Sequence, residues 1–299
     1  MFISVAVPTC NRPADIARCL ASLAQVRYPS WEVLVVDQSD GDETRQALAE
    51  WDEFVPSIVY IRHKEKNLSA ARNLAMRNAS GKVLAFIDDD CTVAPDWLDS
   101  VGAMFAQEAD ALLVFGAVHA APHDSSSTFI TTVAMQDEQR LRGSLSATRV
   151  RGMGASMYLL LSPGVERSFD VLLGAGARFR SGEDYDYAYR LLASGGTVVQ
   201  TPRIAVTHHG ARPYAGGAAR SILQNYLYGA GACHAKLLRC GHWAMIAAIL
   251  ELLADNVRLV RPLNAFVRKP THAGRLLVYL RGLRDGLRVP VDRRKEVFT

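Results

Sequence analysis

The chain has 299 residues, of which 49% are apolar and 21% are charged, so it is long enough to bury a sizeable core and is not a disordered or fibrous chain. Its net charge of +4 is unevenly distributed. Residues 258–299 contain eleven Lys and Arg against three Asp and Glu, whereas the first 257 residues contain 23 basic and 27 acidic side chains. A basic tail on an acidic body predicts either an anionic contact, such as phospholipid or nucleic acid, or a solvated helix surface.

The cysteines and the hydropathy pattern indicate the cellular compartment in which the protein is expected. The five cysteines are odd in number and lack paired metal-ligand spacing, which argues against a disulfide framework and a zinc site. No basic leader precedes the first apolar run, and the most apolar later stretch, 243–254, is too short to span a bilayer and contains Glu251. We therefore expect a cytoplasmic protein with reduced thiols.

The first 90 residues alternate short apolar runs with segments of helical periodicity. Strands are expected at 2–9, 31–40, 57–63 and 82–90, the second and fourth with acids at their ends, and helices at 13–26, 42–51 and 68–79. This alternation predicts a mostly parallel sheet with helices on both faces. Such sheets bind ligands at the carboxyl ends of their strands. The polar clusters PTCNR (8–12), DQSDGD (37–42) and DDDC (88–91) all stand at such ends.

The remainder of the chain is less regular. Strands are expected at 109–120 and 154–161, a polar loop at 121–128, a helix at 182–195, and one or two closing strands at 197–210. After about residue 215 the pattern becomes helical, with an amphipathic stretch at 243–260. We predict two domains, 1–215 and a basic helical extension at 216–299.

Three consecutive aspartates, Asp88, Asp89 and Asp90, end the fourth expected strand. Each like-charged pair at ~4 Å costs about 4 kcal/mol near a protein surface, so a compensating cation is expected there. If the strand continued, Asp88 and Asp90 would share one side and could hold a hard divalent ion. The alternative is a solvated turn whose aspartates cap the following helix.

Two further clusters suggest contacts with a nucleotide. Asp37 ends the second strand, where a carboxylate could accept a hydrogen bond from uracil, thymine or guanine; alternatively it forms a turn. In NLSAARN (67–73), Asn67 precedes an expected helix and Arg72 lies one turn inside it. A helix N-terminus beside an arginine suits a phosphate or ribose, although Arg72 could instead pair with a nearby acid.

The second half contains an acidic pair and a histidine pair. Glu183 and Asp184 begin a helix rich in tyrosine, where acids are favoured by the helix dipole but could also project into a cleft as a general base. His208 and His209 follow a strand, and a histidine there either completes a metal site or lies unremarkably on the surface.

Taken in order, SVAVPTCNR, VVDQSD, NLSAARN, FIDDDC, GEDYDYAYRL and VTHHG resemble the family 2 glycosyltransferases over about residues 2–212. That resemblance implies a GT-A fold and inverting transfer of a sugar from a UDP-, dTDP- or GDP-linked donor to an acceptor hydroxyl. It departs from the family at Asp37–Asp40, where members often have Asp-Asp-Gly-Ser. The aspartate triplet also leaves the register of the family's Asp-x-Asp motif ambiguous.

The resemblance also assigns roles to residues. Its implied nucleotide-sugar contacts are Pro8, Thr9, Asn11, Arg12, Asp37, Asn67, Arg72, Asp88 and Asp89. A divalent Mg or Mn ion would be held by Asp90, Asp88 and His208. Asp184 matches the catalytic base of the Glu-Asp pair formed with Glu183.

Other functions remain open at this stage. A nucleotidyltransferase would also use metal-bound aspartates but needs no base beside an acceptor pocket, and a non-catalytic nucleotide-binding module needs neither. For the tail we expect peripheral contact with an anionic membrane, at its inner face, or packing on the catalytic domain or between the subunits of a homodimer. We expect no nucleic acid partner.

Overall fold

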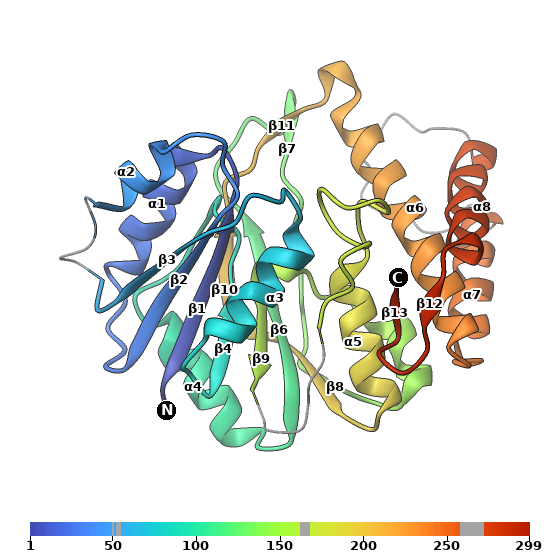
Figure 1. Cartoon of the computed structure of the whole chain (residues 1–299), viewed down its shortest axis with the longest axis horizontal. Helices are drawn as coiled ribbons and strands as arrows, with labels where there is room; N and C mark the ends of the chain where they lie inside the picture. Colours follow the sequence, from blue (N-terminus) through green and yellow to red (C-terminus); the bar gives the residue numbers. More distant parts are fainter. Residues whose placement is uncertain (50, 52–54, 162–167, 258–271) are drawn as a thin grey trace.

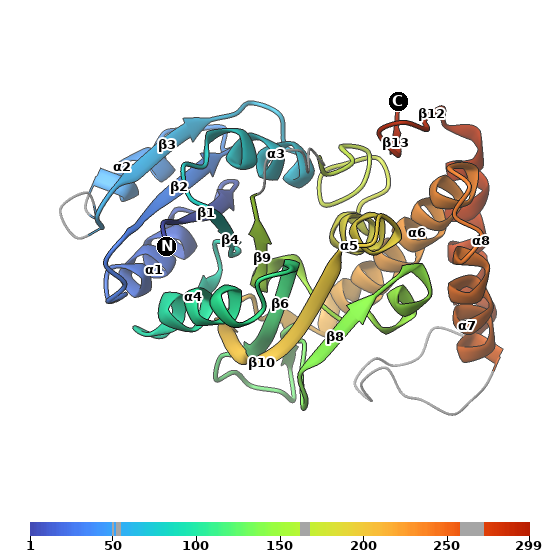
Figure 2. The same ribbon diagram turned by 90° about the horizontal axis from the view of Figure 1, so that it is seen from below.

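The computed structural model describes residues 1–49, 51, 55–161, 168–257 and 272–299. In this part of the chain, nine strands form one central sheet with helices on both faces (Figures 1 and 2). The strands are β1 (Ile3–Thr9), β2 (Trp31–Asp37), β3 (Ile58–Arg62), β4 (Val83–Phe86), β5 (Cys91–Thr92), β6 (Ala111–Ala120), β8 (Gln139–Arg142), β9 (Met157–Leu160) and β10 (Thr197–His208).

The strand order is β3-β2-β1-β4-β9-β6-β10-β5, with β8 also pairing with β10. The first four strands are parallel neighbours, and β6 is parallel to β10, whereas β9 runs antiparallel between β4 and β6. The four expected strands of the first third are therefore present and parallel, but β2 ends at Asp37 and β4 at Phe86, before the acids that the sequence analysis included in them. Because parallel strands end at the same edge, the polar clusters after β1, β2 and β4 lie together there.

Helices cover the sheet because their apolar residues recur at helical spacing. In α1 (Pro13–Leu23), Pro13 occupies the first turn and Ile16, Leu20 and Leu23 are fully buried against one face of the sheet. The same face is covered by α2 (Glu43–Ala49) and α4 (Trp97–Gln107). The other face is covered by α3 (Leu68–Asn78) and α5 (Glu183–Ala193).

Helices dominate the C-terminal part, as expected: α6 (Ala218–Arg239), α7 (Met245–Val257) and α8 (His272–Arg288), followed by the hairpin β12 (Val291–Asp292) and β13 (Val297–Phe298). The backbones of α6 and α8 approach closely at glycines. A Cβ at Gly231 would lie 2.3 Å from the carbonyl oxygen of Tyr279, and a Cβ at Gly282 would lie 2.1 Å from that of Tyr228. Residues 258–260 of the expected amphipathic stretch lie outside the described residues, and the domain boundary at 215/216 stays a prediction.

Shorter elements complete the chain. A two-stranded pair, β7 (Thr128–Phe129) with β11 (Arg212–Pro213), follows the polar loop, and the 3-10 turns are η1 (Ser144–Arg149), η2 (Gly154–Ser156) and η3 (Ala215–Gly217). The closing segment is a single strand, β10, whose register against β6 shifts between Thr201 and Ala205. None of the described helices is both long and apolar enough to cross a bilayer.

Candidate active site

A cavity of about 390 Å³ opens at the carboxyl ends of β1, β2 and β4. Its walls come from segments far apart in the sequence, including the loop after β1, the start of α3 and the end of β10. Predicted site residues that line it are Pro8, Thr9, Arg12, Asn67, Asp88, Asp89, Asp90 and His208. The structure thus brings together eight of the residues that the sequence singled out.

The three aspartates form an acidic turn, defined here as Asp88–Asp90, rather than a continuation of the strand. β4 ends at Phe86, and the N–H of Cys91 donates to the carbonyl oxygen of Asp88 at 3.0 Å. Among the described contacts, none of the three carboxylates accepts a hydrogen bond from the first turn of α4. The helix-capping alternative is therefore not favoured by the geometry.

Cationic and polar groups partly balance this acidic turn. Nη1 of Arg12 donates to Asp89 at 3.1 Å and to Asp90 at 2.9 Å, while Oγ1 of Thr9 donates to Asp89 at 2.8 Å. Burial nevertheless outweighs the charge of Arg12 and raises the pKa of Asp89 to about 6. Burial also raises the pKa of Asp88. The charge of Arg72 opposes this shift, and the neighbouring Asp90 adds to it.

Asp90 and His208 lie at the centre of a group that could hold a cation. Nε2 of His208 is 3.1 Å from Oδ1 of Asp90, and Nδ1 of His208 lies 2.9 Å from the carbonyl oxygen of Thr131. Burial alone would raise the pKa of Asp90, but its hydrogen bond with His208 and the nearby Arg12 outweigh burial and lower that pKa. A carboxylate beside an imidazole with a fixed second nitrogen is a donor set that suits Mg²⁺ or Mn²⁺.

Cys91 completes this group geometrically, because one ligand atom from each of Asp90, Cys91 and His208 lies within 4.8 Å of the others. Burial and the neighbouring carboxylates Asp88 and Asp90 raise the pKa of the Cys91 thiol. A thiol that keeps its proton is a poor metal ligand. Asp90 and His208 therefore fit a hard divalent ion better than Cys91 does, whereas Asp88, the third predicted ligand, is not part of this group.

The structure engages Asp37 and Asn11 with neighbouring protein groups. Asp37 is fully buried and accepts hydrogen bonds from the N–H of Ser39 at 2.8 Å, the hydroxyl of Tyr60 at 2.8 Å and Nη1 of Arg62 at 3.0 Å. The Asn11 side chain exchanges hydrogen bonds with Asp40, 2.9 Å each way. The predicted contacts of Asp37 and Asn11 with the nucleotide stay predictions.

The NLSAARN segment connects the two halves of the site. The side-chain oxygen Oδ1 of Asn67 caps α3 by accepting from the N–H of Ala70, and the side-chain Nδ2 donates to the carbonyl oxygen of Val171 at 2.8 Å. Arg72 is 2% exposed and donates from Nη1 to Glu183 at 2.9 Å, while Nη2 lies 3.7 Å from Asp88. Arg72 therefore spans the acidic turn and the Glu183-Asp184 pair, and a contact with ribose or phosphate stays a prediction.

The acidic pair stands at the start of α5, where Gly182 adopts a left-handed conformation as the helix begins. Glu183 is buried against Arg72, and burial followed by the charge of Asp184 raises its pKa to about 7. Asp184 is only partly buried and accepts from the N–H of Gly154 at 3.1 Å. Neither acid is among the residues that line the cavity, but Gly154 follows Met153 of its wall, and Asp184 is the more exposed of the two acids.

Sequence reasoning missed two charged residues of the cavity wall and two glycines packed against predicted site residues. Lys66 and Arg212 line the cavity and add positive charge near the acidic turn. Gly210 is needed because a Cβ there would lie 2.6 Å from Oδ2 of Asp90 and 2.7 Å from Nε2 of His208. Gly154 is needed because a Cβ there would lie 2.1 Å from Nη2 of Arg72. Sequence position could have indicated these residues: Lys66 is next to Asn67, Gly210 and Arg212 closely follow His208, and Gly154 begins the strand expected at 154–161.

Comparison with known proteins identifies the family. Residues 4–151 match the model described as Glycosyl transferase family 2. The chain belongs to glycosyltransferase family 2. It is 30% identical over 212 residues to the succinoglycan biosynthesis protein ExoM of Rhizobium meliloti, which covers 68% of this chain and 65% of that protein. It is 33% identical over 101 residues to the glycosyltransferase AglE of Haloferax volcanii, a third of each chain. This family 2 chain thus spans less than two thirds of the length of both relatives.

Solved structures confirm the expected GT-A architecture. Residues 1–349 of S. aureus TarS, in complex with UDP-GlcNAc, superpose with a TM-score of 0.66 at 15% identity, covering 96% of this chain and 80% of TarS. The mannosyltransferase PcManGT of Pyrobaculum calidifontis, in complex with GDP-Man and Mn²⁺, gives a TM-score of 0.56 at 17% identity, with coverages of 95% and 84%. At these identities the likeness concerns the fold.

Proposed function

We propose that this chain catalyses the inverting transfer of a sugar from a UDP-, dTDP- or GDP-linked donor to an acceptor hydroxyl, in the synthesis of a polysaccharide, glycolipid or natural-product glycan. One observation carries the proposal. In a family 2 chain, the acidic turn lines the cavity after β4, and Asp184, at the start of α5, accepts a hydrogen bond from Gly154, the residue after Met153 of the cavity wall. A nucleotidyltransferase needs no partly exposed carboxylate at that second position.

The reaction follows from the placement of these groups. Asp184 accepts the proton of the acceptor hydroxyl, whose oxygen attacks the anomeric carbon from the face opposite the diphosphate. The bond between the anomeric carbon and the diphosphate oxygen breaks, the electron pair leaves with the nucleoside diphosphate, and the configuration inverts. Arg12, Lys66 and Arg212 line the cavity and stabilise the negative charge of the leaving group.

We propose Asp90 and His208, with Asp88, as the residues that hold Mg²⁺ or Mn²⁺. When bound, the divalent ion supplies positive charge as a Lewis acid to the departing diphosphate. In support, the Asp90 carboxylate and the His208 imidazole face each other at 3.1 Å, and Gly210 leaves the space beside them free of a side chain. The like charges of the acidic turn are then offset by the cation and by Arg12.

The direct test is a thermal-shift panel of UDP, dTDP and GDP, each with and without Mn²⁺ or Mg²⁺, with ADP as control. We expect a larger rise in melting temperature when one of the three nucleotides and a metal are present together. Release of free nucleoside diphosphate from the matching sugar donor supports transfer. Release of pyrophosphate from UTP, dTTP or GTP instead would favour a nucleotidyltransferase, and nucleotide binding without turnover would leave a binding module.

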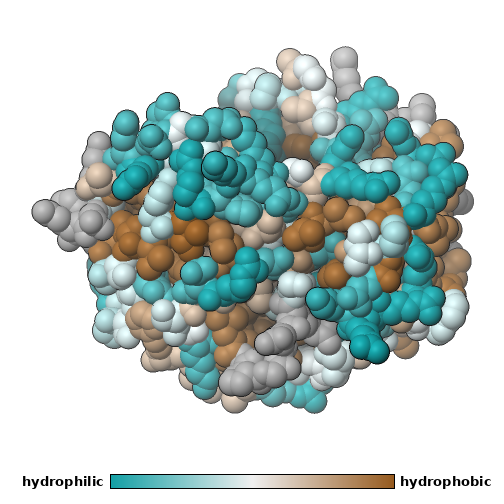
Figure 3. Space-filling model, viewed as in Figure 1, coloured by the Kyte–Doolittle hydropathy of each residue, from teal (hydrophilic) through white to brown (hydrophobic). Residues whose placement is uncertain are grey.

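We further propose that the C-terminal helices contact an anionic membrane at its inner face. Exposed apolar side chains gather on these helices, and apolar surface is visible over α8 at the right-hand edge of Figure 3. They are Trp243, two residues before α7, Ile246 and Leu250 on α7, and Leu277, Leu280 and Leu287 on α8. The exposed side chains of Arg281 and Arg284 add positive charge to α8.

Vesicle flotation tests this contact, using phosphatidylcholine vesicles with and without phosphatidylglycerol. We expect the wild-type protein to float with the anionic vesicles and Trp243→Ser to lose much of that association. A protein that stays at the bottom of the gradient with both vesicles would overturn the membrane proposal. Sedimentation equilibrium on the same sample separates this outcome from the alternative, in which the helices join two subunits of a homodimer.

A further inference from the structure

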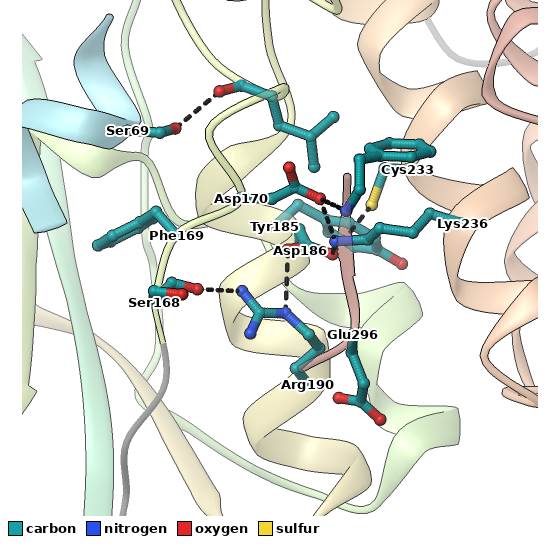
Figure 4. Close-up of polar contacts among 12 residues, drawn as sticks. Ser69, Ser168, Phe169, Asp170, Tyr185, Asp186, Arg190, Cys233, Lys236 and Glu296 are labelled. Carbon is teal, nitrogen blue, oxygen red and sulfur yellow. Dashed lines mark hydrogen bonds and ion pairs between the residues drawn. The ribbon is translucent and has the colours of Figure 1, made fainter. Parts of the chain in front are cut away.

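A second group of charges lies behind α5, away from the cavity, and is completely enclosed. We call it the buried charge network: Asp170, Asp186, Arg190 and Lys236 (Figure 4). Lys236, on α6, is fully buried, and its Nζ donates to Asp170 at 2.9 Å and lies 2.6 Å from Asp186 on α5. An ammonium group in a protein interior is tolerated only when it is paired in this way.

Arg190 and Asp170 make further hydrogen bonds in the network. Nε of Arg190 donates to Asp186 at 3.0 Å, and its Nη2 donates to the carbonyl oxygen of Ser168 at 2.7 Å. Asp170 also accepts from the N–H of Phe298, on β13, at 2.8 Å (Figure 4). Two carboxylates and two cations make the network electrically neutral. It joins α5, the segment before α5, α6 and β13 at one point.

The network acts on the helix that carries the acidic pair. Asp186 lies two residues after Asp184, in the first turns of α5. Burial alone would raise the pKa of Asp186, but the charges of Arg190 and Lys236 outweigh burial and lower it. The Asp186 carboxylate is therefore charged at neutral pH, and its contact with the Lys236 ammonium group is charge-assisted.

The opposite side of the segment before α5 is held by α3. The Asn73 side chain donates to the carbonyl oxygen of Phe169 at 2.8 Å and accepts from its N–H at 2.7 Å, and Ser69 donates to the carbonyl oxygen of Leu173 at 2.7 Å. The segment that leads into α5 is thus fixed by α3 on one side and by Lys236 on the other (Figure 4). Little freedom remains for the start of α5 to shift.

Close packing of α6 against the same point supports this arrangement. A Cβ at Gly229 of α6 would lie 2.4 Å from the carbonyl oxygen of Ser181, two residues before Glu183. Gly229 lets the α6 backbone contact Ser181, just before the start of α5. Lys236 follows seven residues later on the same helix. Helix α6 therefore contacts α5 both at its start and one turn further on.

From these contacts we propose that Lys236 is a positioning residue for sugar transfer: through Asp186 it fixes the position of the Asp184 carboxylate at the cavity, so that the C-terminal helices are part of the catalytic unit. This inference rests on the proposed function, in which Asp184 accepts the proton. A base displaced by about 1 Å can lose about 10²-fold in rate, so a tether of this kind affects turnover directly.

The test separates positioning from stability with charge-balanced variants. Lys236→Met alone leaves an excess buried carboxylate and is expected to lower the melting temperature strongly. The double variant Lys236→Met/Asp170→Asn removes one cation and one anion, leaves the Asp186–Arg190 pair in place, and is expected to recover much of that stability. Asp170→Asn alone keeps the contact between Lys236 and Asp186 and serves as the matched control, with exposed Lys64→Met as a surface control.

Rates are measured as nucleoside diphosphate release from the sugar donor that the thermal-shift panel selects, and are expressed per nucleotide-binding site so that unfolded protein does not count. We expect kcat of the double variant to fall about 10- to 100-fold with the donor KM unchanged, while Asp170→Asn and Lys64→Met keep wild-type kcat. Recovery of wild-type kcat along with stability in the double variant would overturn the positioning role.

Asp184→Asn is measured in the same series to keep the two ideas apart. Wild-type kcat in Asp184→Asn would overturn the proposed function itself. An inactive Asp184→Asn beside a fully active double variant would overturn the role of Lys236 alone.

Discussion

The acidic turn and the buried charge network use the same kinds of side chain in opposite ways. In the network, every carboxylate faces a cation or an N–H within 3.0 Å, and Lys236, Asp170 and Asp186 are fully enclosed. In the acidic turn, Asp89 and Asp90 share one cation, Arg12, while Asp88 lies 3.7 Å from Arg72, and the pKa values of Asp88 and Asp89 are raised beside the cavity. Charge that is fully satisfied by the protein holds the fold, whereas charge left in excess at a cavity is available to a ligand.

The largest expected effect breaks the cavity side of this comparison. Asp184→Asn keeps the shape of the side chain but removes the group that accepts a proton, so kcat should fall about 10³-fold, within the range for general-base catalysis. Affinity for the nucleoside diphosphate should stay within about twofold, because transfer and not donor binding depends on Asp184. Steady-state rates and isothermal titration with the selected nucleotide measure both quantities. Wild-type rates in this variant would remove Asp184 from the mechanism.

The next effect compares stability between the two regions. Asp186→Asn leaves Lys236 paired with one carboxylate, that of Asp170, and weakens the pairing between residue 186 and Arg190. The free energy of unfolding should therefore fall by about 3–5 kcal/mol. Asp88→Asn should leave it unchanged or raise it, because burial and Asp90 already disfavour the charged form of Asp88. Urea unfolding of both variants without metal checks the contrast. Equal losses in the two variants would erase the distinction between satisfied and excess charge.

A smaller effect is expected for donor binding at the acidic turn. Asp90→Asn removes a charged oxygen that faces His208 and should weaken nucleoside diphosphate binding about 10- to 100-fold in the presence of Mn²⁺, but hardly in EDTA. Exposed Asp42→Asn provides a control for loss of one negative charge. Affinities that drop equally with and without Mn²⁺ would show that Asp90 contacts the nucleotide without a metal.

The smallest effect concerns Glu183, which lies between the two regions. Its pKa is about 7 in the folded protein against an ordinary value of 4.5, so the folded protein keeps a proton that the unfolded chain releases in this window. The contribution to stability is therefore fully present below pH 4.5 and is lost as the pH rises to about 7, by up to about 1.4 kcal/mol per pH unit. Urea unfolding from pH 4.5 to 8 should show this slope, flattened in Glu183→Gln. Identical slopes would mean that Glu183 titrates normally.

Much of the donor side of the site could be predicted because it rests on local patterns. Alternating strands and helices placed Thr9, Arg12 and the acidic turn at the same sheet edge, and in the structure they line one cavity. The turn geometry after Phe86 could not be predicted, because the apolar run itself gives no sign that pairing ends before Asp88.

The buried charge network could not be foreseen, since its contacts join distant parts of the chain. Lys236 meets Asp170 across 66 residues, and Asn73 meets Phe169 across 96, with no local pattern marking either pair. Asp186 and Arg190 have helical i, i+4 spacing, which in a sequence suggests an ordinary surface pair rather than a fully buried one. The role of Asn67 and Asn73 in holding the segment before α5 was hidden for the same reason.

Electron paramagnetic resonance of Mn²⁺ tests most directly whether the acidic turn exists to hold a divalent ion together with the donor diphosphate. From this role of the acidic turn we expect the signal of free Mn²⁺ to fall when wild-type protein and the selected nucleoside diphosphate are both added, beyond the loss caused by the nucleotide alone, and we expect this extra loss to disappear in Asp90→Asn. An undiminished free Mn²⁺ signal with the wild-type protein, or the same extra loss in Asp90→Asn, would contradict it.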